Sequence, residues 1–113
     1  VSPGTISGEV IHVDHFGNVV TSIGRFLWRG DKLSLEPAFR KDSAQAVDLE
    51  ADEASVITGE RDIHGIRHTY AEVQSGQVLA LIGSTGHLEI AVREGSGAEE
   101  LGLASGDPVE LRW

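Results

Sequence analysis

Glycine is the residue that most constrains what this chain can fold into. Fourteen glycines are spread along 113 residues, with only three prolines. Glycine adopts turn conformations that other residues avoid and weakens helix interiors, so this spacing favours short elements joined by tight turns. The runs between glycines are rich in β-branched residues, as in Gly8–Asp14, Asn18–Ile23 and Val78–Ile82. We therefore expect an all-β fold, a small β-barrel or sandwich of about seven short strands with one short helix near the C-terminus.

Turn signals and periodicity place the remaining elements. Gly8–Asp14 and Asn18–Ile23 should pair as a hairpin across the turn-prone residues 16–18, and Gly83–Gly86 should form a tight turn. The S-x-x-E spacing of residues 96–99, followed by Gly102, predicts a helix of one or two turns. Further strands are expected at Lys32–Glu36, once within Lys41–Ser55, and at Val56–Ile57, Thr69–Val73, His87–Val92 and Asp107–Leu111.

Charge and cysteine content limit the partners of the chain. It has 9 Lys and Arg against 18 Asp and Glu, a formal net charge of −9, and no cysteine. Phosphate binding needs excess basic residues, so nucleic acids and anionic membranes are poor partners, and disulfides and thiolate metal sites are excluded. No apolar run approaches the ~20 residues of a membrane span, and no signal segment opens the chain. We expect a soluble, cytoplasmic domain with no nucleic-acid or membrane partner.

Two glycine-bounded segments carry groups suited to a small ligand. In Asp14–Asn18, the asparagine amide can donate and accept at once, which fits the edge of a purine base. In Ser84–Ala91, two hydroxyls and backbone amides can hold a carboxylate or phosphate, although the P-loop pattern is missing. Each segment is described equally well as an ordinary turn. Tyr70 and Trp28 are the aromatic residues best suited to stack on a flat ring, with a place in the core as the alternative.

The five histidines do not predict a metal site. His64 and His68 have the spacing of ligands on a helix, but Gly65 and the β-prone residues after His68 favour loop and strand. His12, Asp14 and His15 would point to both faces of a strand. We expect neither a metal nor a cofactor.

Read in order, these segments resemble a known family. GEVIHVDHFGNVVTSI, RHTYAEVQSGQVLALIGSTGHLEIAVREGSGAEELGL and GDPVEL are similar to the C-terminal domain of the S-adenosylmethionine (SAM) hydroxide adenosyltransferases, the SAM hydrolases, which are related to the SAM-dependent chlorinase and fluorinase. The resemblance runs from about Ile6 to Leu111. It implies that residues 1–113 are one β-barrel domain, and that the α/β N-terminal domain preceding it in the family is absent.

The family's reaction sets what the resemblance implies about function. SAM lies between the N-terminal domain of one subunit and the C-terminal domain of its neighbour in a homotrimer, and water or halide attacks the ribose C5′ carbon and displaces methionine. SAM is thus a substrate and no cofactor is needed. Carried over to this chain, the substrate-binding residues would be Asn18, Phe16 and Tyr70 at adenine, Asp14 at the methionine ammonium, Ser84 at its carboxylate, and Glu89 in the pocket wall, with no catalytic residue.

Three positions depart from the family pattern. Gly83 and Ser22 stand where asparagine is common, and Thr85 stands where hydrolases have serine and the fluorinase has arginine, which disfavours a fluorinase. The residues that activate the nucleophile belong to the N-terminal domain, which nothing in this sequence matches. We therefore expect the adenosyl- and methionine-recognising half of a SAM hydrolase, inactive by itself. The alternative is a stand-alone ligand-binding or oligomerisation module, while an OB-like nucleic-acid binder is opposed by the charge of −9.

Overall fold

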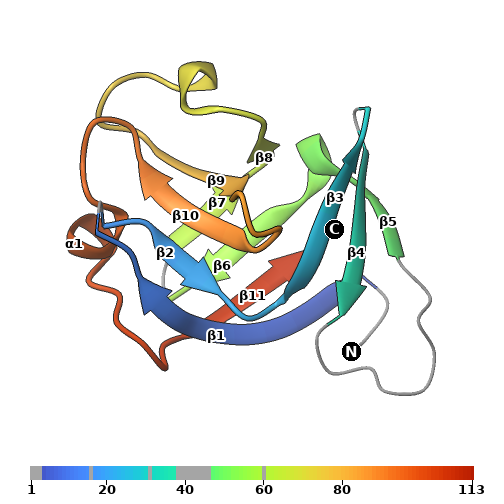
Figure 1. Cartoon of the computed structure of the whole chain (residues 1–113), viewed down its shortest axis with the longest axis horizontal. Coiled ribbons are helices and arrows are strands. Elements are labelled where there is room, and N and C mark those ends of the chain that lie inside the picture. Colours follow the sequence, from blue (N-terminus) through green and yellow to red (C-terminus); the bar gives the residue numbers. More distant parts are fainter. Residues whose placement is uncertain (1–3, 16, 31, 38–46, 60) are drawn as a thin grey trace.

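The chain folds into two β-sheets and three short helices within the part that the computed structural model describes, residues 4–15, 17–30, 32–37, 47–59 and 61–113. Figure 1 shows the larger sheet curving around the interior, with the β3–β4 hairpin beside it. The strands are β1 (Thr5–Val13), β2 (Val19–Thr21), β3 (Gly24–Arg29), β4 (Lys32–Pro37), β5 (Val47–Glu50), β6 (Ser55–Thr58), β7 (Arg61–His64), β8 (Ile66–Arg67), β9 (Val78–Ile82), β10 (Leu88–Val92) and β11 (Pro108–Arg112). The helices are η1 (Ala51–Glu53), η2 (Tyr70–Glu72) and α1 (Gly97–Leu101).

The strand order shows that the larger sheet is nearly closed. Its eight strands run β7-β6-β11-β1-β2-β10-β9-β8, so the two edge strands are β7 and β8. These strands are consecutive in the chain and are separated only by Gly65, which has a φ of +83°. One residue cannot span an open sheet of this width. The sheet must therefore curl until its edges meet, which confirms the expected barrel-like all-β fold.

The smaller sheet, in the order β3-β4-β5, packs on the same core as the larger one. Its buried side chains include Phe26, Leu33, Leu35 and Leu49. The Phe26 amide donates a hydrogen bond to the Gly86 carbonyl at 2.7 Å, which ties β3 to the turn between β9 and β10. The rest of the core comes from one face of the larger sheet, including Ile6, Val10, Val19, Val56, Ile66, Ala80, Leu88, Ile90 and Leu111.

A β-bulge in β1 reverses which face its later residues present. Val10 pairs with Thr21, but the next pair joins His12 to Val20, so β1 has one extra residue. An extra residue moves every later side chain to the opposite face. His12 is consequently exposed, and Glu89 of β10 lies across from the same Val20. The bulge therefore brings the end of β1 and the middle of β10 onto one outer face.

Several expected elements form as predicted. The β1–β2 pair, β9, β10, β11 and the helix at residues 97–101 are present, and Ser96 caps that helix by accepting from the Glu99 amide at 3.3 Å. The expected strand at Thr69–Val73 is wrong, because these residues form the 3₁₀ helix η2. Thr69 and Glu72 make a reciprocal capping box there, and these local hydrogen bonds outweigh the β-propensity of the side chains.

The number of strands exceeds the expectation, because the described residues contain eleven. β3, β7 and β8 are additional. β3 lacks a simple alternation in sequence, since Leu27 is 62% exposed on the outward side between two arginines. Part of the predicted Lys41–Ser55 segment, residues 41–46, lies outside the described residues, while β5 falls within its remainder. Among the described residues, no helix is long and apolar enough to cross a membrane.

Candidate functional site

The turn that begins at Asp14 is held by hydrogen bonds at both ends. The Gly17 amide donates to the Asp14 carbonyl at 3.0 Å, and the Asn18 amide donates to the Asp14 carboxylate at 2.9 Å. Gly17 has a φ of +84°, and a Cβ there would lie 2.1 Å from the Ser96 Oγ. Only glycine fits this position without strain and collision. The turn thus fixes the position of the Asn18 backbone. Phe16, the remaining candidate in this turn, lies outside the described residues.

Tyr70 reaches Asn18 from a distant part of the chain. The Asn18 Nδ2 donates to the Tyr70 phenol oxygen at 2.9 Å, across 52 residues of sequence. Tyr70 begins η2, and the Glu72 carboxylate accepts from the amides of His68 and Thr69 at 2.6 and 3.0 Å, which orders the start of that helix. Tyr70 is 36% exposed, so it is not a core residue.

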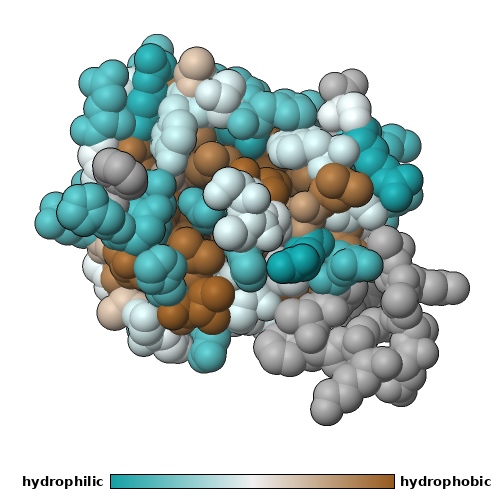
Figure 2. Space-filling model, viewed as in Figure 1, coloured by the Kyte–Doolittle hydropathy of each residue, from teal (hydrophilic) through white to brown (hydrophobic). Residues whose placement is uncertain are grey.

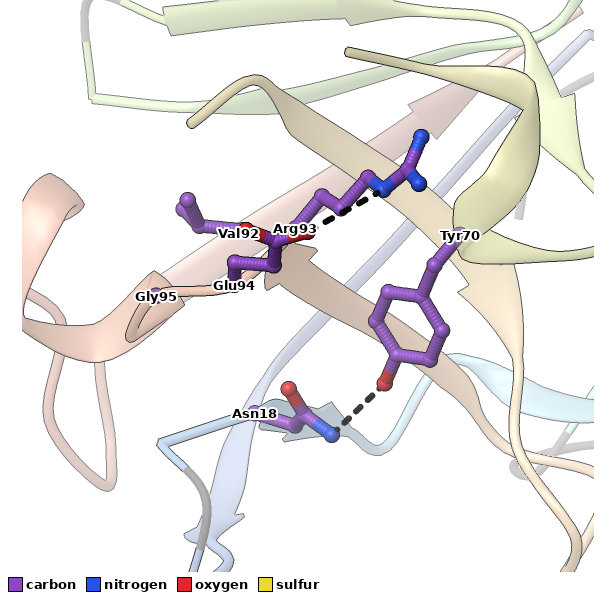
Figure 3. Close-up of a pocket in the computed structure, with 6 residues that line it drawn as sticks. All are labelled: Asn18, Tyr70, Val92, Arg93, Glu94 and Gly95. Carbon is purple, nitrogen blue, oxygen red and sulfur yellow. Dashed lines mark hydrogen bonds and ion pairs between the residues drawn. The ribbon is translucent and has the colours of Figure 1, made fainter. Parts of the chain in front are cut away.

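Asn18 and Tyr70 line a pocket of about 640 Å³ together with Val92, Arg93, Glu94 and Gly95. Figure 3 shows the side chains of Asn18 and Tyr70 pointing toward one another beside residues 92–95, the turn that follows β10. Glu94 has a φ of +60°, which is uncommon for a residue with a side chain. The Arg93 guanidinium is turned to the Val73 carbonyl, to which it donates at 2.6 Å. The wall formed by residues 92–95 therefore includes an unusual backbone conformation.

The carboxylates of Asp14 and Glu89 form an acidic strip on the outer face beside β10. Burial raises the pKa of Glu89 above its ordinary value of 4.5, and the charge of Asp14 raises it further, while His12 acts in the opposite direction. Asp14 and Glu89 are therefore within electrostatic reach although 75 positions separate them in sequence. The Glu89 carboxylate occupies the space beside Gly83, where an added Cβ would lie 1.7 Å from its Oε2. This strip adjoins the turn between β9 and β10.

A second pocket of about 620 Å³ lies between β3 and the β9–β10 turn. The Gly86 amide donates to the Gly83 carbonyl at 3.0 Å, which places Ser84 and Thr85 at the two central positions of the turn. The opposite wall includes Trp28, which stacks on His68 with ring centroids 3.6 Å apart. The complete lining is Arg25, Phe26, Leu27, Trp28, Arg29, Ser34, Glu36, Ile82, Gly83, Ser84, Thr85 and Gly86. Figure 2 shows hydrophobic residues in the middle and at the lower left of this view of the molecule, with hydrophilic residues between and around them.

β10 separates the two pockets. Its residues from Leu88 to Val92 cover four steps of about 3.4 Å, or about 14 Å. Ser84 precedes this strand, and residues 92–95 end it and turn away. A ligand that used both pockets would therefore be extended along β10, past the acidic strip.

The structure groups the predicted residues in three places. Asn18 and Tyr70 meet in the first pocket, Asp14 and Glu89 share the acidic strip, and Ser84 lies in the second pocket. The sequence reasoning missed the walls formed by residues 92–95 and by Arg25 and Arg29. The Glu94-Gly95 pair was a visible turn signal, but nothing local in the sequence indicates that β3 faces Ser84.

The described residues contain no group of three or more His, Cys, Asp or Glu side chains placed to hold a metal ion. His64 ends β7 and His68 follows β8, so the helical spacing considered for this pair does not occur. His68 instead stacks on Trp28.

Comparison with known proteins gives consistent results. A model of the SAM hydroxide adenosyltransferase C-terminal domain matches residues 8–110. The (R)-S-adenosyl-L-methionine hydrolase of Thermus thermophilus is 35% identical over 104 residues, which is 92% of this chain and 31% of that protein. The enzyme of the same name from Salinispora tropica is 32% identical over 105 residues, 93% of this chain and 32% of that protein.

Solved structures show the same architecture. A conserved hypothetical protein from Thermus thermophilus has a TM-score of 0.63 and 33% identity, covering 97% of this chain and 36% of that one. An uncharacterized conserved protein from Thermotoga maritima has a TM-score of 0.69 and 27% identity, covering all of this chain and 38% of that one. The chain thus spans about a third of the length of these relatives. It belongs to the family of SAM hydroxide adenosyltransferase C-terminal domains.

Proposed function

We propose that this chain is the adenosyl- and methionine-recognising part of a SAM hydrolase, which converts SAM and water to adenosine and methionine. The observation that carries the proposal is the arrangement along β10, with the Asn18–Tyr70 pocket at one end and the Ser84 turn at the other. SAM is itself extended, with an adenine ring at one end, an α-amino acid at the other and a sulfonium between them. The relatives that share this domain are named as hydrolases of SAM.

The first pocket would hold the adenine ring. An asparagine side chain can donate to and accept from the edge of a purine, and a tyrosine ring can pack on its face. The hydrogen bond between Asn18 and Tyr70 orients both groups before a ligand enters. A residue oriented in advance loses less conformational entropy on binding. Phe16, outside the described residues, would line the same pocket.

The methionine part would extend toward the β9–β10 turn. Asp14 would bind the ammonium group and Ser84 the carboxylate, with Glu89 in the wall between the two pockets. The positive sulfonium also favours this acidic strip, because an opposite charge nearby stabilises the ionised carboxylates.

The reaction itself needs groups from elsewhere. Attack of a water oxygen on the ribose C5′ carbon breaks the C5′–sulfur bond, and the bonding electrons stay on sulfur, so methionine leaves as a neutral thioether. The attacking water keeps one of its two protons in the new 5′-hydroxyl group of adenosine and releases the other to solvent, which balances the positive charge lost from sulfur. An enzyme accelerates such a step mainly by aligning and desolvating the nucleophile. We propose that an N-terminal α/β domain, of the same or a neighbouring subunit in a homotrimer, supplies the residues that do this.

Binding and turnover by this chain test the proposal. We expect adenosine to shift NMR signals of residues around Asn18 and Tyr70, with weak affinity because half of the pocket would be missing. After incubation of the chain with SAM, chromatography should detect no more adenosine than forms in a control without protein. Absence of adenosine binding would contradict the recognition role. Clear turnover would contradict the need for a second domain.

A further inference from the structure

The β9–β10 turn lies between groups of opposite charge. On its Gly83 side, the Glu89 carboxylate fills the space that a side chain at position 83 would occupy. On its Gly86 side, the turn is bonded to β3 through the Phe26 amide at 2.7 Å. β3 carries Arg25 and Arg29, which both line the pocket above the turn. A negative and a positive group thus flank a four-residue turn.

The position of Arg25 follows from the hydrogen bond at Phe26. Arg25 is the preceding residue, so its Cα lies about 3.8 Å from that of Phe26. The backbone contact is close, since an added Cβ at Gly86 would lie 3.4 Å from the Phe26 carbonyl oxygen. A guanidinium extends about 6–7 Å from its Cα, far enough to reach a ligand at the turn. Arg25 therefore adjoins the turn by backbone geometry.

The charges around this pocket favour an anion on the β3 side. Arg25 and Arg29 form no ion pair with any residue that the structure describes. Glu36 lies opposite Arg25 in the β3–β4 register and also lines the pocket. The lining thus has two positive groups and one negative group. One carboxylate ligand would balance it.

The turn also offers uncharged donors. Thr85 Oγ1 is 2.9 Å from the His87 Nδ1, so that hydroxyl already has a partner. Within the described part of the chain, no hydrogen bond engages the Ser84 hydroxyl or the backbone amides of Ser84 and Thr85. Neighbouring amides at a tight turn form a favourable site for an anion.

We infer that the β9–β10 turn binds the zwitterionic end of an α-amino acid, with Arg25 pairing with the carboxylate and Glu89 joining Asp14 at the ammonium. This assignment rests on the proposed function, which gave the carboxylate to Ser84 and the ammonium to Asp14 alone. It makes Arg25 and Glu89 specificity residues for the amino-acid end of SAM. Arg29 contributes a second positive charge further along β3.

Three ligands separate the two charges in a titration of this chain by NMR or calorimetry. SAM carries both the carboxylate and the ammonium, decarboxylated SAM keeps only the ammonium, and adenosine has neither. Arg25→Gln should weaken the binding of SAM about five- to tenfold, because a charge-assisted hydrogen bond to the carboxylate is lost. The affinities for decarboxylated SAM and adenosine, which lack that carboxylate, should not change. Glu89→Gln should weaken the binding of SAM and decarboxylated SAM alike and leave adenosine unchanged. S-adenosylhomocysteine, which has the ammonium but no sulfonium, should lose affinity by the same factor, and an unchanged affinity for it would assign the effect of Glu89 to the sulfonium instead.

Two further variants complete the experiment. Arg25→Lys keeps the charge and should lose less SAM affinity than Arg25→Gln. Arg61→Gln removes the same type of charge from an exposed position outside both pockets, where Arg61 pairs with Glu100, and should change nothing.

The outcomes distinguish the inference from the function on which it rests. If adenosine binds but SAM and decarboxylated SAM bind equally well, the carboxylate is not recognised and the inference is wrong, while the proposed function stands. If SAM binds better than decarboxylated SAM but Arg25→Gln leaves that ratio unchanged, Arg25 has no role. If none of the three ligands binds, the proposed function fails, and the inference fails with it.

Discussion

At one end of β10, Asn18 and Tyr70 are joined by a hydrogen bond over a pocket whose other wall is the turn of residues 92–95. At the other end, Arg25 and Arg29 face the β9–β10 turn without an ion pair among the described residues. The first end is pre-arranged, while the second offers charge to whatever enters it. This difference matches a ligand with a flat, neutral ring at one end and ions at the other.

The two ends also differ in how far apart their residues lie in the sequence. The first pocket combines positions 18, 70 and 92–95, whose supports include the Gly17 turn and the η2 capping box. The second joins two hairpins, β3–β4 and β9–β10, through one backbone hydrogen bond at Phe26. A substitution in the Gly17 turn or the η2 capping box should therefore disturb the Asn18–Tyr70 pocket more strongly than loss of one arginine side chain disturbs the pocket at the β9–β10 turn.

Gly17→Ala should have the largest effect. The new methyl group would lie 2.1 Å from the Ser96 Oγ, on a backbone with a φ of +84°. Strain and collision together should cost about 2–4 kcal/mol of unfolding free energy, measured by urea denaturation. Gly76→Ala is a matched control, because its φ is +83° and nothing lies within 4 Å of the added group. Equal losses for the two variants would show that the contact with Ser96 is unimportant.

Asn18→Ala should come next, with an effect on binding rather than on folding. Without the amide, a buried edge of the adenine ring would lose its partner, at a cost of roughly 1–3 kcal/mol in adenosine affinity. Calorimetric titration of adenosine into this chain measures it. The unfolding free energy should change less than the binding free energy, since Asn18 is half-buried. Unchanged adenosine affinity would remove Asn18 from the site.

Tyr70→Phe tests the pre-arrangement of the first pocket. The ring stays, but the phenol oxygen that accepts from Asn18 is lost, so we expect adenosine to bind more weakly by about 0.5–1.5 kcal/mol. A double-mutant cycle with Asn18→Ala should give a coupling energy of similar size. Additive effects would mean that the two residues act independently.

Glu89→Gln should change the free energy of unfolding by the smallest amount of these variants, and the size of that change should depend on pH. The raised pKa of Glu89 means that the folded chain holds this proton more tightly than the unfolded chain does. Stability from this group is therefore greatest at or below the ordinary value of 4.5 and is lost as the pH rises through the raised pKa. Relative to the variant, the wild-type chain should therefore lose unfolding free energy as the pH rises from 4.5 through the raised pKa of Glu89, as measured by urea denaturation at a series of pH values. Glu53→Gln, at an exposed position, should show no such trend.

Much of the fold was predictable because its signals are local. The β-branched runs of β9 and β10, the turn at Gly83–Gly86 and the capped helix ending before Gly102 each follow from neighbouring residues. The strand predicted at Thr69–Val73 was wrong for a local reason too, since Thr69 and Glu72 have the spacing of a capping box within a run of β-prone residues. β3 was missed because its outward residues include the exposed Leu27.

The site divides differently. By itself, the sequence determined the all-β class, through its glycines and β-branched runs. Its resemblance to a known family named the candidate binding residues, which are Asp14, Phe16, Asn18, Tyr70, Ser84 and Glu89. Only the tertiary structure decided which of them meet. The bulge in β1 turns its end toward Glu89, and the strand order β2-β10-β9-β8 brings Tyr70, between β8 and β9, to Asn18 before β2. The hydrogen bond at Phe26 brings Arg25 to the Ser84 turn. These contacts join residues far apart in the chain, and no local pattern encodes such a pairing.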